Sequence, residues 1–200
     1  MSDGVVHALA LIAGIVGFSM LIPHVAAERT TGELTAVIVY AIGFFSMISF
    51  SFAYNMWPMT SVKWALRRFD HSAIFLMIAG TCTAFLSQLH SPWWAGSLMA
   101  AIWAGALGGI AMKVFMPGRF ERAALALYLS LGWICLIGIV PIVRALEPQT
   151  LALVVLGGAI YTSGVFFYRW DDLRYHNTIW HGFVVTAAGV HFAGVALAVA

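Results

Sequence analysis

The chain has 200 residues, the usual length of a single domain, and its composition is strongly apolar. Hydrophobic residues make up 62% of it and charged residues 9%, against roughly 45–50% and about 25% in a soluble domain. So little charge cannot cover the surface of a soluble protein of this size, and the mean hydropathy of +0.93 agrees. The composition therefore predicts an integral membrane protein. The net charge of +2, spread thinly along the chain, predicts no nucleic-acid partner.

The uncharged runs between charged residues predict the membrane spans. Each run is at least as long as the ~20 residues that cross the hydrocarbon core, and run 71–112 is long enough for two crossings. The segment His90–Trp94 interrupts that run near its middle. We therefore predict an all-α fold, a seven-transmembrane helix bundle in one domain over residues 1–200. The spans are expected at about 5–27, 34–57, 71–90, 94–113, 122–143, 149–168 and 176–198.

The ten Lys and Arg residues are distributed unevenly between the two sides of the predicted bundle. Eight lie in the loops that follow the second, fourth and sixth spans, and the other two are Arg29 and Arg144 in the alternate loops. Basic loops stay in the cytoplasm. We therefore predict a cytoplasmic N-terminus, a periplasmic C-terminus and a multi-pass location in the bacterial inner membrane.

Polar side chains inside the spans are costly in a bilayer and therefore mark candidate functional positions. Ser51 and Asn55 are four residues apart near the end of the second span, and Asn177 and His181 are four apart at the start of the seventh. Residues four apart share a helix face. Asp70 begins the third predicted span at the same depth. We expect these five side chains to converge at the cytoplasmic end, because bundle cores build ligand and metal sites from facing helices.

Structural interpretations compete with this one. Asp70 is placed to cap the third helix through its carboxylate. Four other histidines are candidates for ordinary hydrogen bonding without a functional role. They are His7, His24 and His90 near the ends of spans and His191 deeper within the seventh span. A haem held by a buried histidine pair, such as His7 with His181 or His191, is a further alternative.

Three motifs together resemble the bacterial haemolysin III proteins, which belong with the progestin and adipoQ receptor (PAQR) family. The motifs are Ser51–Asn55 (SFAYN), Arg67–Phe75 (RRFDHSAIF) and Ile179–Val184 (IWHGFV). The resemblance covers essentially the whole chain and implies a seven-span membrane protein. It also implies kinship with membrane hydrolases such as the alkaline ceramidases, while the name haemolysin implies cytolysis.

The resemblance implies a zinc site. In the wider group of hydrolases, the metal is surrounded by a serine and a histidine four apart in span 2, an aspartate opening span 3, and two histidines four apart in span 7. In this chain the serine falls on Ser51, the aspartate on Asp70 and the second span-7 histidine on His181. The resemblance therefore makes His181 a zinc ligand and gives Ser51 and Asp70 the catalytic task of holding and activating its water.

The two remaining histidine positions hold asparagine in this chain, Asn55 and Asn177. Amide oxygens are harder and weaker ligands than imidazole. His176 stands beside the second position, but five residues turn a helix by about 500°, which leaves it roughly 140° from His181. His176 reaches the site only if the helix begins after it. We therefore expect a weak or altered zinc site, with His181, Asn55, Asn177 and, on that condition, His176 as ligands.

The sequence leaves more than one function open. The first is a metal-dependent intramembrane hydrolase acting on a lipid amide or ester that enters from the inner leaflet, with Asp70 as base toward the metal-bound water. The second is a cytolytic pore or a receptor-like membrane protein without enzymatic activity. A monomeric pore needs a continuous polar stripe, and the first, fourth, fifth and sixth spans carry few polar side chains. The expected partners are membrane lipids and a lipid substrate, with the oligomeric state left open.

Overall fold

The computed structural model describes residues 2–200, so the first residue of the predicted domain lies outside it. Over this range the chain is helical and contains seven helical segments that are long and apolar enough to cross a membrane. The predicted all-α, seven-span bundle is therefore confirmed for residues 2–200. The elements are α1 (Ser2–Glu28), α2 (Thr31–Met56), α3 (Ser61–Leu86), α4 (Pro92–Phe115), α5 (Glu121–Gly132), the 3₁₀ segment η1 (Ile134–Gly138), α6 (Ile139–Ala145), α7 (Pro148–Tyr168) and α8 (His176–Ala198).

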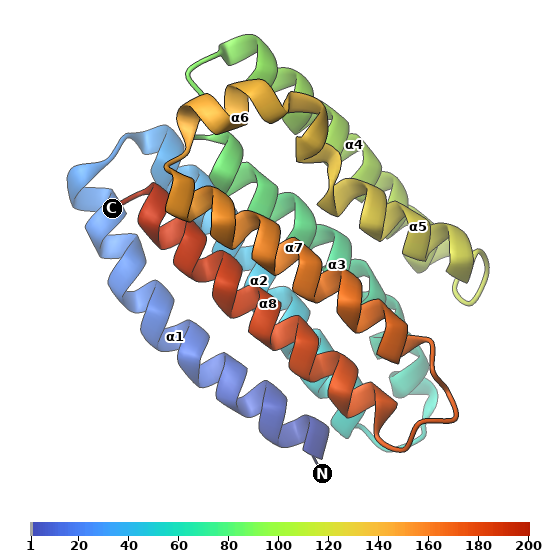
Figure 1. Cartoon of the computed structure of the whole chain (residues 1–200). Helices are drawn as coiled ribbons and strands as arrows, with labels where there is room; N and C mark the ends of the chain where they lie inside the picture. The colour runs from blue at the N-terminus through green and yellow to red at the C-terminus, as the bar shows by residue number, and fades with distance from the viewer. Residues whose placement is uncertain (1) are drawn as a thin grey trace.

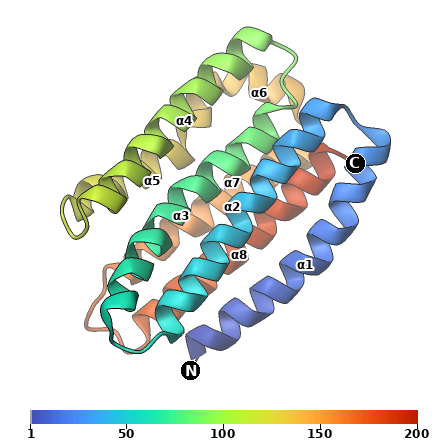
Figure 2. The ribbon, with the colours of Figure 1, turned by 180° about the vertical axis from the view of Figure 1, so that it is seen from behind.

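The helices form a bundle with two distinct edges. At one edge α1 lies against α2 and α8, and at the other lie α4, α5 and α6 (Figure 1). Figure 2 shows from behind that α2 and α3 lie between these edges, where they pack on each other, as α7 and α8 do. The chain termini lie at opposite ends of the bundle (Figure 1). We call the end where α1 begins the N-terminal end and the end where α1 finishes the C-terminal end.

Two glycines bring the backbones of α2 and α3 into contact. A Cβ atom on Gly43 would lie 2.9 Å from the carbonyl oxygen of Leu76, and one on Gly80 would lie 3.0 Å from the carbonyl oxygen of Val39. Small residues allow such close approach in membrane bundles, where packing holds helices together. The close α2–α3 contact makes α3 the most enclosed span of the described chain, with 72% of its apolar window buried.

The third helix begins at Ser61 rather than near position 71, so the prediction that Asp70 opens the span is wrong. Asp70 is nine residues into α3 and cannot cap its start. The boundary moves because charged side chains interrupt an apolar run without interrupting the backbone hydrogen bonds of a helix. Lys63, expected in the preceding loop, therefore lies in the first turn of α3, and Lys113 lies in the last turn of α4.

The fifth span, expected as one helix over 122–143, is broken. α5 ends at Gly132, and η1 separates it from α6. Trp133 stands at the break and donates its Nε1–H to the Thr162 hydroxyl on α7 at 3.1 Å. Short 3₁₀ stretches within a helix mark a change of winding. The break therefore divides the span into two helices, α5 and α6, whose axes are not constrained to be collinear.

Candidate functional site

A cavity of about 320 Å³ lies mainly among α2, α3, α5, α7 and α8, and His7 of α1 and Lys113 of α4 also line it. Apolar side chains such as Met47, Ile74 and Leu129 form much of its wall. Its lining residues come from the N-terminal end and the middle of the bundle, and within residues 2–200 none comes from the loops at the C-terminal end. The volume is at the lower end of the range for small-molecule sites. The cavity is therefore a pocket that extends past the middle of the bundle, to Cys82 of α3 and His191 of α8, but stops short of the C-terminal end.

The structure brings five of the six predicted site residues to this cavity. They are Ser51, Asn55, Asp70, Asn177 and His181. α2 runs toward the N-terminal end and α8 runs away from it, so the two pairs spaced four residues apart meet at the same depth (Figure 1). Ser51 and His181 are each 7% exposed and Asp70 is 9% exposed. The predicted convergence is thus present, while the catalytic and ligand roles stay predictions.

His176 lies apart from this group. It is the first residue of α8 and follows Tyr175, whose φ of 64° puts the backbone in the left-handed region as the helix starts. His176 is therefore inside the helix, roughly 140° around the axis from His181. Within the described part of the chain it is not a lining residue of the cavity, and its Nδ1 atom is buried without a hydrogen-bond partner. The condition under which it was expected to supply a ligand, a helix starting after it, is not met.

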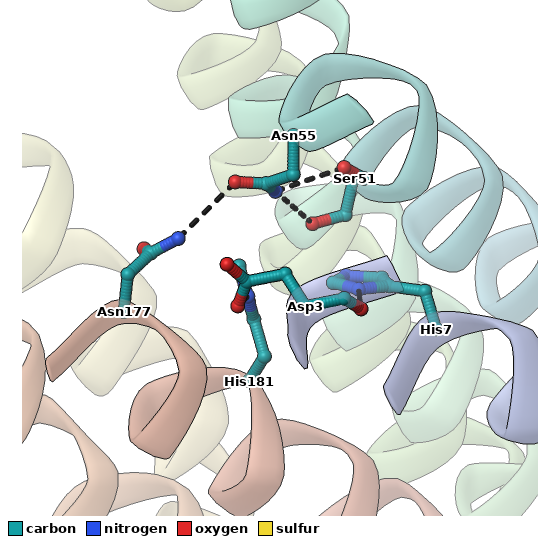
Figure 3. A network of polar contacts seen from close by, with 6 residues as sticks. All are labelled: Asp3, His7, Ser51, Asn55, Asn177 and His181. Carbon is teal, nitrogen blue, oxygen red and sulfur yellow. Dashed lines mark hydrogen bonds and ion pairs between the residues drawn. The ribbon is translucent and has the colours of Figure 1, made fainter. Parts of the chain in front are cut away.

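Asn55 and Asn177 bond to each other across the space between α2 and α8 (Figure 3). The Nδ2 group of Asn177 donates to Oδ1 of Asn55 at 3.1 Å. The Nδ2 group of Asn55 in turn donates to the carbonyl oxygen of Ser51 at 2.9 Å and lies 3.4 Å from its hydroxyl. Both polar atoms of the Asn55 amide are therefore used within the protein, and its oxygen faces Asn177. We call the Asn177–Asn55 bond the amide bridge.

Asp3 and His7 of α1 join the site, although Asp3 was not among the predicted candidates. Nδ1 of His181 donates to Oδ1 of Asp3 at 3.0 Å, and Thr178 is a second hydrogen-bond partner of that carboxylate. His7 donates from Nδ1 to the carbonyl oxygen of Asp3 at 2.6 Å, and its ring contacts the His181 ring edge-on, with centroids 4.6 Å apart (Figure 3). The signal in the sequence is the four-residue spacing of Asp3 and His7, which repeats that of the pairs on α2 and α8.

Asp70 faces the same cavity from α3. Ser51 is its side-chain hydrogen-bond partner, and the guanidinium of Arg67, one turn earlier, interacts with it electrostatically. A positioned carboxylate within hydrogen-bond reach of a water is able to take its proton. Asp70 therefore has the surroundings of a general base, with Ser51 to hold its orientation.

A network of ion pairs forms another wall of the cavity and was also missed. Nζ of Lys113 on α4 lies 2.5 Å from Oε2 of Glu121 on α5, and Nη2 of Arg67 on α3 lies 3.4 Å from Oε1 of the same carboxylate. Lys113 is only 2% exposed. Nearby, the Tyr128 hydroxyl donates to the carbonyl oxygen of His71 at 2.9 Å. These contacts tie α3, α4 and α5 together at the N-terminal end.

The side chains present do not fit the zinc site that the resemblance implies. In residues 2–200 no three His, Cys, Asp or Glu side chains are grouped so that they could hold a metal ion. Zinc sites normally have at least three good protein ligands. Here the two asparagines at histidine positions bond to each other, which leaves His181 as the one imidazole among the three matched histidine positions. The edge contact between His7 and His181 likewise leaves no space for a haem between the two rings.

Comparison with known proteins places the chain in a family. Residues 1–192 match the family described as haemolysin-III related. The chain belongs to this family. This haemolysin-III-related chain is 32% identical over 195 residues to hemolysin-3 of Bacillus cereus, covering 96% of the chain and 88% of the relative. The resemblance seen in the three motifs is therefore confirmed, and the chain is a polytopic membrane protein of haemolysin III type.

Two further relatives show how widely this similarity extends. The hemolysin-3 homolog of Bacillus subtilis is 28% identical over 192 residues, covering 96% of the chain and 90% of that protein. The human monocyte to macrophage differentiation factor is 26% identical over 195 residues, covering 94% of the chain and 79% of that protein. No solved structure matches the chain.

Proposed function

We propose that this chain is an intramembrane hydrolase that cleaves an amide or ester bond of a lipid whose acyl chain occupies the cavity. The observation that carries the proposal is a cavity with largely apolar walls that also holds buried acid–base groups, Asp70 with Ser51 and His181 with Asp3. Pockets of this kind, apolar with a few convergent polar groups, are the usual form of a small-molecule site.

The cavity matches a lipid in both of its chemical parts. A lipid tail is already in an apolar medium, so moving it from the bilayer to a wall of Met47, Ile74 and Leu129 requires little desolvation. The linkage next to the head group needs polar partners, and these gather at the N-terminal end around Asp70 and His181. The acyl chain therefore points toward the middle of the bundle and the scissile bond lies near the N-terminal end.

The proposed reaction uses Asp70 as the general base. Asp70 takes a proton from a water molecule as the water oxygen bonds to the carbonyl carbon of the lipid, and Ser51 holds the carboxylate in place. His181, as the imidazolium paired with Asp3 through Nδ1, donates a hydrogen bond from Nε2 to the carbonyl oxygen as negative charge develops on it. The bond from carbon to nitrogen or oxygen then breaks, and the leaving group takes the proton from Asp70. The products are a fatty acid and an amine or an alcohol.

The test is hydrolysis by the purified protein. The protein in lipid nanodiscs is incubated with an N-acyl amide lipid and with an ester phospholipid, and released fatty acid is measured by mass spectrometry. Release from either substrate that is lost in Asp70→Asn supports the proposal. Absence of release from both substrates by the folded protein contradicts it, as does release that Asp70→Asn leaves unchanged.

The proposed location is the bacterial inner membrane, with the N-terminal end in the cytoplasm. The support is the placement of eight basic residues near this end, in the first turns of α3, the end of α4, the loop 116–120, the start of α5 and the loop before α8. Reporter fusions within residues 116–120 and after Ala200 test it. The first reporter should be active in the cytoplasm and the second in the periplasm, and the reverse result would invert the assignment.

Cytolysis is a second candidate because the relatives from Bacillus carry the name hemolysin-3. A pore in the single chain would need a passage to both ends, whereas the lining of the cavity stops short of the C-terminal end in the described residues. Dye release from liposomes of ether lipids, which contain no ester or amide bond to cleave, distinguishes the two functions. A hydrolase leaves the dye inside such liposomes, and dye release that Asp70→Asn does not reduce would favour the pore.

A further inference from the structure

We infer that the amide bridge and the Asp3–His181 pair together link α1, α2 and α8 in place of a metal ion, so that the N-terminal end of the bundle is held together without metal. A metal bound at the positions of Asn55, Asn177 and His181 would link α2 to α8. In this chain that link is the amide bridge at 3.1 Å. The Asp3–His181 bond at 3.0 Å adds a link from α8 to α1.

The amide bridge and metal binding exclude each other. A metal ion at Oδ1 of Asn55 would displace the Nδ2 group of Asn177, which would then lack its partner in a partly buried position. Turning the Asn55 amide does not avoid this cost, because its Nδ2 group is bonded to the Ser51 carbonyl oxygen. Since amide oxygens are weak ligands for zinc, the ion recovers little in exchange.

Asp3 is a positioning residue for His181. Its carboxylate is 24% exposed while the His181 side chain is 8% exposed, so the partly exposed acid anchors a buried ring. The bond assigns the Nδ1 proton of His181 and fixes the ring plane, and the edge contact with His7 packs against the same ring. α1 therefore holds the His181 ring through Nδ1, the nitrogen through which metal-bound histidines also donate to a carboxylate, so the amide bridge rather than this bond opposes the metal.

The first test measures metal content. The natural chain and the double variant Asn55→His/Asn177→His are purified in detergent, equilibrated with zinc, dialysed, and analysed for zinc per chain. The natural chain should hold well below one zinc, and its melting temperature should not change with EDTA. The double variant should approach one zinc per chain and lose stability with EDTA. Adding His181→Ala to it should abolish the gain, whereas the control His24→Ala, an exposed residue near the C-terminal end, should not.

Two results of this test would overturn the inference. The first is a natural chain that carries about one zinc and melts at a lower temperature after chelation. The second is a folded double variant that gains no zinc. That result would show that the positions of Asn55 and Asn177 cannot supply ligands to a metal, so the amide bridge would not replace one. Neither readout depends on the hydrolysis proposed above, so a metal-free protein without hydrolase activity would leave this inference standing.

The second test measures the amide bridge itself and does not require the double histidine variant to fold. In EDTA, Asn55→Ala and Asn177→Ala should each lower the melting temperature by about 2–4 °C, and the double variant should fall no further than the larger single effect. The control pair Asn55→Ala with Ser97→Ala, on the distant helix α4, should show additive shifts. Additive shifts for Asn55 and Asn177 would show that the bridge does not hold the helices together.

Discussion

The two ends of the bundle use polar side chains in different ways. At the C-terminal end they bond to the ends of helices: Thr30 and Glu33 form a capping box at the start of α2, and Arg29 donates to the carbonyl oxygens of Val199 and Ala200. At the N-terminal end they bond across helices and lie around a cavity. Figure 3 shows these contacts among side chains of α1, α2 and α8.

This difference separates support of the fold from a candidate site. Helix ends leave backbone groups without intrahelical partners, and a side chain that satisfies them is fully used. Glu33 is such a residue, since its carboxylate accepts from the Thr30 backbone and from Gln88. Asp70 is the same kind of acid, but it lies nine residues inside a helix and faces a cavity. What each carboxylate contacts, rather than the residue type, therefore separates Glu33, which supports the fold, from Asp70, which belongs to the candidate site.

The largest expected contrast between the ends is in hydrolysis. Asp70→Asn keeps the size of the side chain but removes the base, so the rate of fatty-acid release should fall by roughly 10²–10⁴-fold. Glu33→Gln, the matched acid at the C-terminal end, should leave the rate unchanged. Initial rates with saturating lipid measure both. Equal rate losses in the two variants would show that the ends do not differ in chemistry.

The next effect concerns the ion-pair network at the N-terminal end. Glu121→Gln leaves the buried ammonium of Lys113 without its nearest counter-charge, which should lower the free energy of unfolding by about 3 kcal/mol. The double variant Lys113→Met/Glu121→Leu removes both charges and should be more stable than the single variant. Denaturant unfolding in detergent measures this. If the double variant is less stable than Glu121→Gln, the Lys113–Glu121 ion pair stabilises the fold by more than the neutralisation of two buried charges.

A third prediction tests the contact between α2 and α3 that lies between the two ends. Gly43→Ala places a methyl group against the backbone of α3, so the free energy of unfolding should fall by about 1–3 kcal/mol. Gly108→Ala is the matched control because no atom beyond the adjacent backbone of its own helix lies within 4 Å of the added carbon, and it should be neutral or stabilising by up to about 1 kcal/mol. Thermal unfolding separates the two, and similar values would argue against backbone contact at Gly43.

The smallest effect is expected at the C-terminal end. Thr30→Ala removes the side-chain cap of α2 and should cost about 1 kcal/mol of stability. Hydrolysis and zinc content should not change, because the cap contacts neither the cavity nor the amide bridge. Melting temperature and hydrolysis rate are measured on the same sample. A lower hydrolysis rate per folded molecule would connect the two ends and weaken the distinction between them.

Much of the site was predictable because its residues repeat one simple spacing. Pairs four residues apart at helix ends, Ser51 with Asn55 and Asn177 with His181, share a face in any helix, and the alternation of spans places both at one end. Asp70 was expected at that depth for a wrong reason, since α3 begins at Ser61 and Asp70 lies within it.

Other features could not be predicted, because they depend on which helices are neighbours. Nothing in the spacing of Asp3 indicates that α1 packs beside α8, or that its carboxylate therefore meets His181. The bond between Asn55 and Asn177 and the sharing of Glu121 by Lys113 and Arg67 also join residues from different helices.

The sequence by itself determined the membrane class, the seven spans and the end at which the polar pairs gather, because hydrophobic length and helical periodicity are local properties of the chain. The tertiary structure alone decided the start of α3 at Ser61, the break between α5 and α6, the extent of the cavity and the partner of each polar group. The physical reason is that a polar atom in a bilayer is costly without a hydrogen-bond partner. Whether that partner is a backbone group or another side chain depends on the packing of helices distant in sequence.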